Sequence, residues 1–596
     1  MSKQSTAALE AEIHRLNLEV HTLKTQQGSE ISVGDYLLTR LEQLGVTDRS
    51  VDHTDHQDLV EDHPSISWVG NCNELNAAYA ADGYARASNS IGVILTTFGV
   101  GELSAVNGIA GAFSEMVPVL NLVGVPSTSQ QHSKPMLHHT LGDGRSFDAY
   151  TIAAQQFTYS QACLKNKNHA AAEIDRVLID CVTKARPVYL SLPTDLVSAK
   201  ISTERLRTPL TRSQPPNDPQ IESFVIDTIV KRFEEAEGDV VVLVDACAIR
   251  HDAKAELNEF LRKTNFPVYS TPMGKTAVDE NFERYGGIYL GSISRPEIRE
   301  RVESAKLVLS MGGLRSDFNT GNFSYHIPVK HTIELHSDTT KVQYAVFQGV
   351  GMKELIPKLT ERLESYHIAA SKLVVPRFLA PVPKEKTETI THSFFWPRLA
   401  QFFRPRDFIV TETGTANFGI LDVPLPEKSV LISQILWGSI GCLLGASLVA
   451  KESGQGRAIL FVGDGSLQLT VQELSVMLRS GVKPIIFVLN NSGYTIERFI
   501  HGKARKYNDI SNWNWTGLLK TLGDPDETLS SSYTVHNKAE LSALLDNATF
   551  ARAEKMQMVE VIMDRLDAPL SLQLQAEASG RANAYGASSN SATTFA

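Results

Sequence analysis

Short apolar runs that fit β-strands alternate along this chain with stretches of helical periodicity, and the alternation is repeated three times. Parallel sheets flanked by helices produce such alternation, whereas sandwiches and helical bundles do not. The pattern therefore predicts an α/β protein with three doubly wound parallel-sheet domains. The predicted strands are 92–97, 117–125 and 187–192 in the first domain, 240–244, 266–270, 306–310 and 332–335 in the second, and 408–410, 458–462 and 484–489 in the third.

Two proline-rich segments, at 208–220 and 376–386, interrupt the alternation. Clustered prolines are typical of connections between folded parts, so we interpret both segments as linkers. The predicted units are an N-terminal domain over 31–205, a central domain over 220–370 and a C-terminal domain over 388–570.

The two ends of the chain depart from the α/β pattern. Residues 1–30 predict a helical extension, because apolar residues recur there at spacings of four and three. The repeat is short, so an amphipathic helix on its own domain is favoured over a coiled coil between chains. Residues 573–596 are rich in Ala, Ser, Gly and Asn, which predicts a flexible tail. The apolar repeat consists of Leu9, Ile13, Leu16, Val20 and Leu23.

Composition excludes several classes of function. The 596-residue chain has a formal net charge of -10, whereas a nucleic-acid interface needs a concentrated basic surface. Its five cysteines are scattered and show no CxxC spacing, so neither a disulfide framework nor a zinc site is expected. No apolar run approaches the roughly 20 residues of a membrane span, and no signal-peptide core opens the sequence. We therefore expect no membrane partner and a cytoplasmic location.

The segment 457–493 contains the strongest candidate for chemistry. An apolar strand pattern leads into Gly463-Asp464-Gly465-Ser466, and a helix and a second strand then lead into Asn490-Asn491-Ser492-Gly493. Ligands of parallel sheets bind outside the carboxyl ends of the strands, and a helix that begins near Ser466 offers free N–H groups to a phosphate. A carboxylate, an amide oxygen and a carbonyl suit Mg²⁺, which completes its coordination with water and phosphates. Ordinary turn formation is the alternative for each motif taken alone.

The order and spacing of these two turns are similar to the signature of thiamine diphosphate enzymes. Four motifs in addition resemble the fungal pyruvate decarboxylase family, from about residue 32 to residue 572. They are NCNELNAAYAADGYAR at 71–86, HHTLG at 138–142, SQILWGSIG at 433–441 and GYTIE at 493–497.

This resemblance implies thiamine diphosphate and Mg²⁺ as cofactors. Loss of CO₂ from a 2-oxo acid leaves electrons that only such a cofactor accepts. In the family a glutamate, Glu74 here, hydrogen-bonds the aminopyrimidine ring, the Gly438 carbonyl faces its other side, and Ile440 wedges the two cofactor rings. The resemblance assigns Mg²⁺ to Asp464, Asn491 and the Gly493 carbonyl. The further cofactor contacts that it implies are Thr413, Thr415, Ser439, Gly463, Gly465, Ser466, Tyr494, Thr495 and Ile496.

Proton transfer after CO₂ loss requires groups that titrate near neutrality. His138 and His139 form an adjacent pair, and Glu497 follows the second turn motif. In the family these positions bind the substrate carboxylate, protonate the intermediate and release the aldehyde. Without the resemblance, one buried and one solvated loop histidine would be the simpler interpretation.

The segment Asp48 to Gln57 departs from the family. Fungal relatives have an apolar strand and a Gly-Asp-Phe-Asn loop here, whose aspartate takes part in proton transfer. This chain has neither, so we expect a disrupted first strand and no catalytic aspartate, although Asp52 or Asp55 could substitute. Weak activity and an error in the coding sequence are both compatible with this difference.

The resemblance predicts non-oxidative decarboxylation of a small 2-oxo acid, with pyruvate first and aromatic or branched 2-oxo acids as alternatives. The pocket positions are Phe318, Ile496, Ile500 and Thr413, and Asn417 stands where relatives commonly have alanine. A further alternative is a weakly active homologue with an assembly role. The family arrangement implies a dimer or tetramer, in which Glu74 of one subunit faces the Mg²⁺ site of another.

Overall fold

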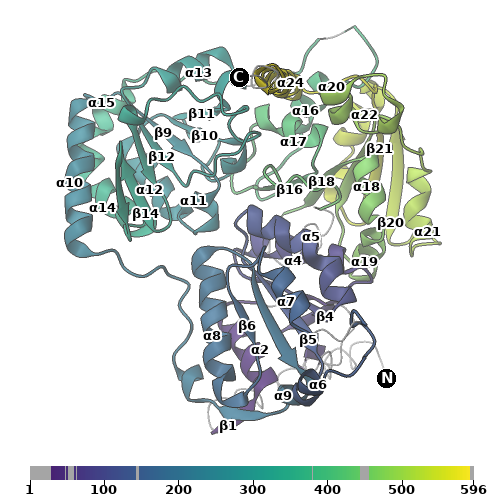
Figure 1. Cartoon of the computed structure of the whole chain (residues 1–596). Helices are drawn as coiled ribbons and strands as arrows, with labels where there is room; N and C mark the ends of the chain where they lie inside the picture. The colour runs from purple at the N-terminus through teal and green to yellow at the C-terminus, as the bar shows by residue number, and fades with distance from the viewer. Residues whose placement is uncertain are drawn as a thin grey trace, which may run out of the picture. The chain divides into compact units, whose positions relative to one another are not determined.

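The computed structural model describes residues 29–46, 48–51, 60–61, 63–142, 147–378, 380–384, 386–442 and 456–590 (Figure 1). The chain divides into two compact units, 1–213 and 214–596. The predictions on the apolar repeat in 1–30, and on Asp52 and Asp55, lie outside the described residues.

The first unit contains a six-stranded parallel sheet with the order β3-β2-β4-β5-β7-β6. Val93 and Leu95 of β4 pack with α2 (Val33–Gln43) and α8 (Lys167–Lys184), whereas Ile94 between them packs with α4 (Glu74–Ser88) and α5 (Val100–Ser114). Helices therefore cover both faces, and the prediction of a doubly wound domain is confirmed. The strands are β2 (Asp48–Val51), β3 (Ser67–Gly70), β4 (Gly92–Thr97), β5 (Val119–Val125), β6 (Gln161–Cys163) and β7 (Val188–Pro193).

Strand β2 corrects the expectation of a disrupted first strand. Asp48–Val51 pairs in parallel with β3 along its length and with β4 through Ser50 and Val51. A sheet ladder is made by backbone N–H and C=O groups, so a polar sequence can occupy a strand position between two neighbours. The first strand is thus present although three of its four residues are polar.

The second unit contains two sheets, one of seven strands and one of six. The 240–348 sheet has the order β11-β10-β9-β12-β13-β14-β15, and the 408–562 sheet has the order β17-β16-β18-β19-β21-β20. The second of these is parallel throughout, as predicted. The strands are β9 (Val240–Val244), β10 (Val268–Ser270), β11 (Tyr285–Ile288), β12 (Leu307–Met311), β13 (Thr332–Leu335), β14 (Thr339–Val342), β15 (Ala345–Gln348), β16 (Phe408–Thr411), β17 (Val430–Ser433), β18 (Ala458–Gly463), β19 (Ile485–Asn490), β20 (Ser530–Val535) and β21 (Met556–Ile562).

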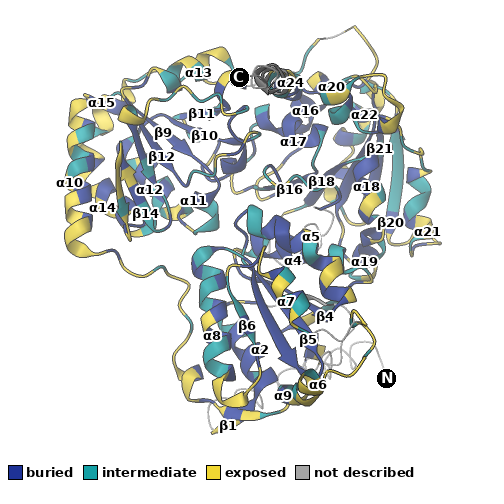
Figure 2. Cartoon of the chain, viewed as in Figure 1, coloured by how far each residue is buried: buried dark blue, intermediate teal, exposed yellow. Residues whose placement is uncertain are grey.

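The edge of the first of these sheets differs from the prediction. Strands β14 and β15 are antiparallel to their neighbours, because short turns and not helical crossovers connect them to β13. The central strands β9, β12 and β19 are buried along their whole length, and the exposed residues lie mainly on the outer faces of the helices (Figure 2). The apolar runs in the sequence therefore correspond to strands that are covered on both faces.

The C-terminal segment forms a helix, α24 (Leu570–Asn590), beside α20 (Thr495–His501), which corrects the predicted flexible tail over 573–590 (Figure 1). Leu572, Gln575 and Ala576 are buried, and their spacing places them on one helical face. Leu572 packs against Phe418, and the Ser571 hydroxyl donates to the Phe418 carbonyl at 3.2 Å. Burial of this face outweighs the low-complexity composition; residues 591–596 lie outside the described residues.

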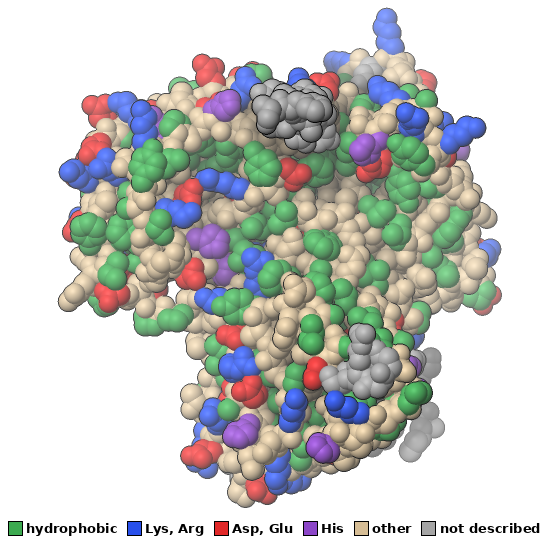
Figure 3. All heavy atoms as spheres, in the orientation of Figure 1, with side chains coloured by type: hydrophobic (Ala, Val, Ile, Leu, Met, Phe, Trp, Pro, Cys, Tyr) green, Lys and Arg blue, Asp and Glu red, His purple; other side chains and the backbone are tan. Residues whose placement is uncertain are grey.

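None of the five cysteines forms a disulfide within the part of the chain that the structure describes. No helix in the described part of the chain is long and apolar enough to cross a membrane. On the face shown in Figure 3, blue Lys and Arg side chains are interspersed with red Asp and Glu side chains.

The burial of His392, at the start of α16 (His392–Ala400), predicts how the stability of the protein depends on pH. Trp396 Nε1 donates to His392 Nδ1 at 3.0 Å, and burial lowers the pKa of His392 to about 3. The unfolded chain therefore binds a proton that the folded chain does not, so stability is lost as pH falls below about 6.5, at about 1.4 kcal/mol per pH unit. His392→Asn keeps an acceptor but does not titrate. We expect its urea midpoint to fall less between pH 6.5 and pH 5 than that of the unsubstituted protein, and equal slopes would contradict this account.

Candidate active site

Glu74 is the first residue of α4, and the preceding asparagines fix its position. Asn73 caps the helix, because its Oδ1 accepts from the N–H groups of Leu75 and Asn76 at 2.9 and 3.3 Å. Asn71 Oδ1 accepts from the Asn73 N–H at 3.2 Å. The cap therefore fixes the backbone position from which the half-buried Glu74 side chain extends.

The first turn of α5 brings Glu74 and His139 to one place. A Cβ on Gly101 would lie 3.4 Å from Glu74 Oε1, and a Cβ on Gly99 would lie 2.4 Å from the His139 carbonyl oxygen. Gly99 also has a φ of +69°. Glycine is therefore required at Gly99, both by its backbone conformation and by the close approach of the histidine loop.

The histidine pair lies on an exposed loop with a strained backbone. The His138 and His139 rings are 4.7 Å apart in an edge arrangement, and the Phe98 ring is 5.8 Å from that of His139. His139 has a φ of +68°, which is rare for a residue with a side chain, and the Tyr150 hydroxyl donates to its carbonyl at 2.7 Å. Such strain occurs where the surrounding contacts enforce it, often at functional sites.

Glu102, which the motif analysis missed, holds the same turn from inside the protein. Its Oε1 accepts from the Gly99 N–H at 2.8 Å, and its Oε2 accepts from the Tyr189 hydroxyl at 3.0 Å. Burial raises the pKa of Glu102 to about 7. The sequence contains one signal for Glu102, because a glutamate three residues after a helix cap is typical of a capping box. That signal does not show that the carboxyl is buried.

Glu102→Gln tests this raised pKa. The folded pKa of about 7 exceeds the usual 4.5, so the stability contributed by the protonated carboxyl is present below pH 4.5 and lost as pH rises through 7. The shift corresponds to about 3 kcal/mol. We expect the urea midpoint of Glu102→Gln to rise relative to the unsubstituted protein between pH 4.5 and pH 8. A constant difference between the two proteins would exclude the titration of Glu102.

In the second unit, Asp464 lies between the two predicted turns. It is the first residue of α18 (Asp464–Thr470), directly after β18, and its Oδ1 accepts from the Gly465 N–H at 2.8 Å. Its Oδ2 accepts from the Gly493 N–H at 3.0 Å, so the structure brings the Gly-Asp-Gly and Asn-Asn motifs together. Burial raises the pKa of Asp464 to about 6, which shows that the site disfavours an uncompensated negative charge.

The donor set around Asp464 fits Mg²⁺. Asn491 is buried, and its Oδ1 has no hydrogen-bond partner among the described residues. The Gly493 carbonyl accepts from the Thr495 N–H at 3.0 Å and retains a second lone pair. A cation would pair the Asn491 oxygen and compensate the buried Asp464 carboxylate. These oxygen donors are the type that Mg²⁺ prefers.

The turn after β19 has no space for a side chain at position 493, which is a glycine. A Cβ there would lie 2.1 Å from the Asn508 carbonyl oxygen, and Gly493 has a φ of +124°. The buried Arg498 donates to the Ser492 carbonyl at 3.0 Å, to the Asn508 carbonyl at 3.2 Å and to Asp509 at 2.7 Å. Arg498 thus fixes the turn from behind, and it is a second residue that the motif analysis did not single out.

The loop with the predicted aminopyrimidine contacts is held by two buried side chains. Gln434 Oε1 accepts from the Ser439 N–H at 2.6 Å, and Glu412 Oε2 accepts from the Gly441 N–H at 2.7 Å. Gly438 has a φ of +66°, and Gly438, Ser439 and Ile440 are half-buried. Gln434 lies inside the motif that carried the resemblance, but its contact with Ser439 is visible only in the folded chain.

The remaining predicted contacts lie at the carboxyl ends of β16 and β18. The Ser466 hydroxyl is 3.5 Å from the Thr413 carbonyl, and Thr415 begins α17 (Thr415–Gly419). A Cβ on Gly465 would lie 2.5 Å from the Tyr494 ring, so that glycine lets the ring approach. Gly463 is the residue before α18.

The structure gives the contacts of two further predicted residues, Asn417 and Glu497. The Asn417 amide donates to the Gln434 carbonyl at 2.9 Å, while its buried Oδ1 has no partner among the described residues. Glu497 is half-buried on α20, and its Oε2 lies 3.4 Å from His501 Nε2. Ile496 packs in one apolar cluster with Phe318.

Comparison with known proteins identifies the class. Three family models match: "Thiamine pyrophosphate enzyme, N-terminal TPP binding domain" at 31–148, "Thiamine pyrophosphate enzyme, central domain" at 226–361, and "Thiamine pyrophosphate enzyme, C-terminal TPP binding domain" at 412–561. Fold and site thus define a thiamine diphosphate-dependent enzyme, and the prediction of thiamine diphosphate with Mg²⁺ is confirmed.

Curated relatives narrow this class. The chain is 45% identical to the pyruvate decarboxylase of Aspergillus terreus, over 93% of this chain and 98% of the relative. It is 45% identical to that of Candida glabrata and 44% identical to isozyme 2 of Saccharomyces cerevisiae, again over 93% of this chain and over 99% and 100% of the relatives. The chain belongs to the pyruvate decarboxylase family.

Proposed function

We propose that this protein converts pyruvate and a proton into acetaldehyde and CO₂, with thiamine diphosphate and Mg²⁺. The observation that carries the proposal is the pair of turns joined by the Gly493 N–H bond to Asp464, with the unpaired buried oxygen of Asn491 beside it. Near full-length similarity to proteins named pyruvate decarboxylase supports the choice of reaction.

The cofactor would be held at its two ends by different parts of the chain. Asp464, Asn491 and the Gly493 carbonyl would bind Mg²⁺, and Ser466 and Thr415 would face the diphosphate. Gly438, with the loop that Gln434 holds, would contact the aminopyrimidine. When bound, the thiazolium of thiamine diphosphate accepts the electron pair that loss of CO₂ releases.

The acid and base side chains would control protons around that cofactor. Glu74 would hold a proton at the aminopyrimidine nitrogen. His138, His139 and Glu497 would exchange protons with the substrate and retain its carboxylate before decarboxylation. The Glu102 contact to Gly99 supports this assignment, because it fixes the turn against which Glu74 and His139 lie.

Several finer features of the proposal come from the family resemblance. The protein would assemble as a homodimer or homotetramer, with Glu74 of one subunit facing the Mg²⁺ site of another, and would act in the cytoplasm. The domain boundaries 31–205, 220–370 and 388–570 stay predictions. So does the absence of a nucleic-acid partner.

Two alternative functions are a decarboxylase for another 2-oxo acid and a weakly active assembly protein. Asn417 motivates the first, and the missing Gly-Asp-Phe-Asn loop motivates the second. The Asn417 amide is larger and more polar than the alanine common in relatives, so it would change the shape and polarity of the substrate pocket, and aromatic or branched 2-oxo acids stay alternative substrates. A weakly active assembly protein is the other candidate, because loss of a general acid typically lowers rates about a hundred- to ten-thousand-fold.

The first experiment measures acetaldehyde and CO₂ release from pyruvate by the purified protein with thiamine diphosphate and Mg²⁺. Phenylpyruvate, indolepyruvate and a branched 2-oxo acid serve as parallel substrates. Preferred turnover of pyruvate would support the proposal. Turnover of another 2-oxo acid would change the substrate, and no turnover by protein that still binds the cofactor would favour the assembly role.

A further inference from the structure

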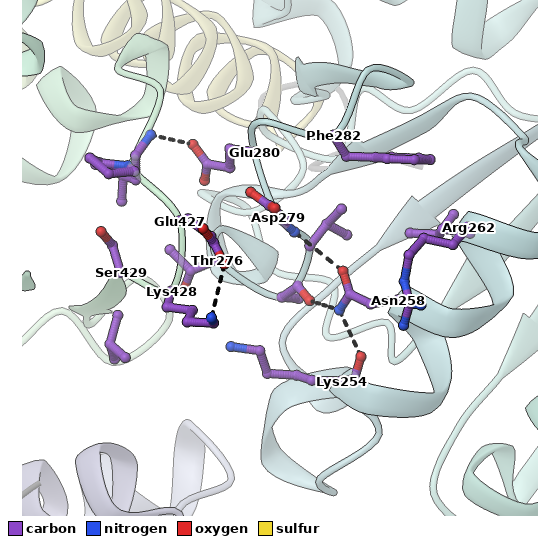
Figure 4. A pocket seen from close by; sticks show the side chains of 16 residues that line it. Lys254, Asn258, Arg262, Thr276, Asp279, Glu280, Phe282, Glu427, Lys428 and Ser429 are labelled. Carbon is purple, nitrogen blue, oxygen red and sulfur yellow. Dashed lines mark hydrogen bonds and ion pairs between the residues drawn. The ribbon is translucent and has the colours of Figure 1, made fainter. Parts of the chain in front are cut away.

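The second unit contains a cavity that the proposed reaction does not use. Its volume is about 440 Å³, and it lies between α12 (Lys254–Thr264) with the 276–282 segment on one side and the 425–430 segment on the other (Figure 4). None of the predicted cofactor, metal or proton-transfer residues lines it. This size is within the range of sites for small molecules.

The cavity walls are fixed by hydrogen bonds before any ligand binds. Asn258 Nδ2 on α12 donates to the Ala277 carbonyl at 3.0 Å, which ties the helix to the 276–282 segment. Lys275 Nζ donates to Glu280 at 2.7 Å and to the Val423 carbonyl at 2.7 Å. The Leu425 N–H donates to Glu280 at 2.9 Å. A preformed wall of this kind lowers the ordering cost of binding.

Two buried oxygens in this wall lack partners. Glu280 is 3% exposed, and its Oε1 has no hydrogen bond within the part of the chain that the structure describes, although its Oε2 is fully engaged. Ser429 is 5% exposed, and its Oγ likewise has no partner there. A buried polar atom without a partner costs free energy, so both atoms indicate a missing donor or acceptor.

Two lysine side chains supply positive charge at the same cavity. Figure 4 shows Lys254 and Lys428 extending toward one another from opposite walls. Lys428 pairs with Glu427 at 3.0 Å, whereas Lys254 Nζ makes no hydrogen bond or ion pair with any described residue. Burial lowers the pKa of Lys254, and the Asp252 carboxylate opposes this shift only in part. Apolar side chains of Leu261, Val278 and Phe282 line the space beside these charges.

We propose that this cavity binds a small hydroxylated organic anion, whose phosphate or carboxylate lies between Lys254 and Lys428. A hydroxyl of the ligand donates to Glu280 Oε1, and Ser429 Oγ donates to the ligand. A hydroxylated three-carbon body fits beside the apolar wall. The site is separate from the cofactor residues and does not depend on the proposed reaction.

The test uses the whole protein saturated with thiamine diphosphate and Mg²⁺, so that phosphate groups cannot enter the diphosphate site. Glycerol 3-phosphate, glycerate and inorganic phosphate are titrated by calorimetry, with neutral glycerol as the control. Glycerol 3-phosphate or glycerate should bind with Kd below about 1 mM, and glycerol should not bind. Whichever of these two ligands binds more tightly shows whether the site prefers a phosphate or a carboxylate. Binding of inorganic phosphate as tightly as glycerol 3-phosphate would contradict the role of the hydroxyls.

Lys254→Met keeps the length of the side chain and removes its charge. We expect it to weaken the binding at least about tenfold, as loss of a charge-assisted contact does. Lys306→Met is the matched control, because Lys306 is exposed and lies outside the cavity. In the unsubstituted protein, the ligand should also protect Lys254, but not Lys306, from trinitrobenzenesulfonate. Equal binding by both variants, or no protection of Lys254 at about 10 mM of any of the three anions, would overturn the proposal.

Discussion

Replacing Glu74 with Gln should reduce the rate of pyruvate decarboxylation by about a hundred- to ten-thousand-fold. The substitution keeps the size of the side chain and the Asn73 cap of α4, but it removes the carboxylate that would hold the proton at the aminopyrimidine. The expected loss is in kcat, because the cofactor keeps its diphosphate and Mg²⁺ contacts. Steady-state assays with saturating cofactor measure it.

Glu204→Gln is the matched control, since Glu204 is exposed on the surface of the same unit. It should leave turnover unchanged. Circular dichroism and the unfolding midpoint should be the same for both variants, because the half-buried Glu74 contributes little to the core. A Glu74→Gln protein with normal kcat would remove Glu74 from the mechanism, even if the proposed reaction were correct.

Replacing Asp464 with Ala should weaken binding of thiamine diphosphate with Mg²⁺ at least about a hundredfold, since even residues behind metal ligands cost about 10- to 100-fold. The carboxylate anchors the Gly493 turn and would be the charged ligand of the metal. Cofactor at about 100 times its Kd stabilises the unsubstituted protein by about 2.7 kcal/mol, and Asp464→Ala should lose this gain. Thermal unfolding with and without cofactor measures the difference.

Asp526→Ala controls for the loss of an aspartate, because Asp526 is exposed. It should retain the full cofactor-dependent stabilisation, and EDTA should abolish that stabilisation in the control and in the unsubstituted protein alike. If Asp464→Ala were stabilised by cofactor as much as Asp526→Ala, Asp464 could not be the metal ligand. Activity alone would not separate these outcomes, so the unfolding measurement is the one that decides.

Much of the fold and of the candidate site follows from local patterns. Strand 92–97 was predicted with the bounds that β4 has, and 458–462 and 484–489 correspond to β18 and β19 within one residue. A buried parallel strand is apolar along its length and ends in a polar turn. Both properties depend only on consecutive residues, so the sequence shows them directly. The Asp464 and Gly493 turns were predictable for the same reason.

Other features depend on contacts between distant residues. Strand β2 forms although three of its four residues are polar, because two neighbouring strands supply its hydrogen bonds. Helix α24 forms in a low-complexity segment because Leu572 finds an apolar partner in Phe418. Composition averages over neighbours in the sequence and therefore misses both effects.

The sequence by itself determined the α/β class, the positions of the main strands and the two turn motifs with their Mg²⁺ and diphosphate chemistry. Only the tertiary structure decided that the Glu102 carboxyl is buried, with a raised pKa. It also decided which buried oxygens have no partner among the described residues: those of Asn491, Glu280 and Ser429. Burial and hydrogen-bond satisfaction depend on residues far apart in the chain, such as Lys275 and Val423, and the spacing of residues along one segment does not contain them.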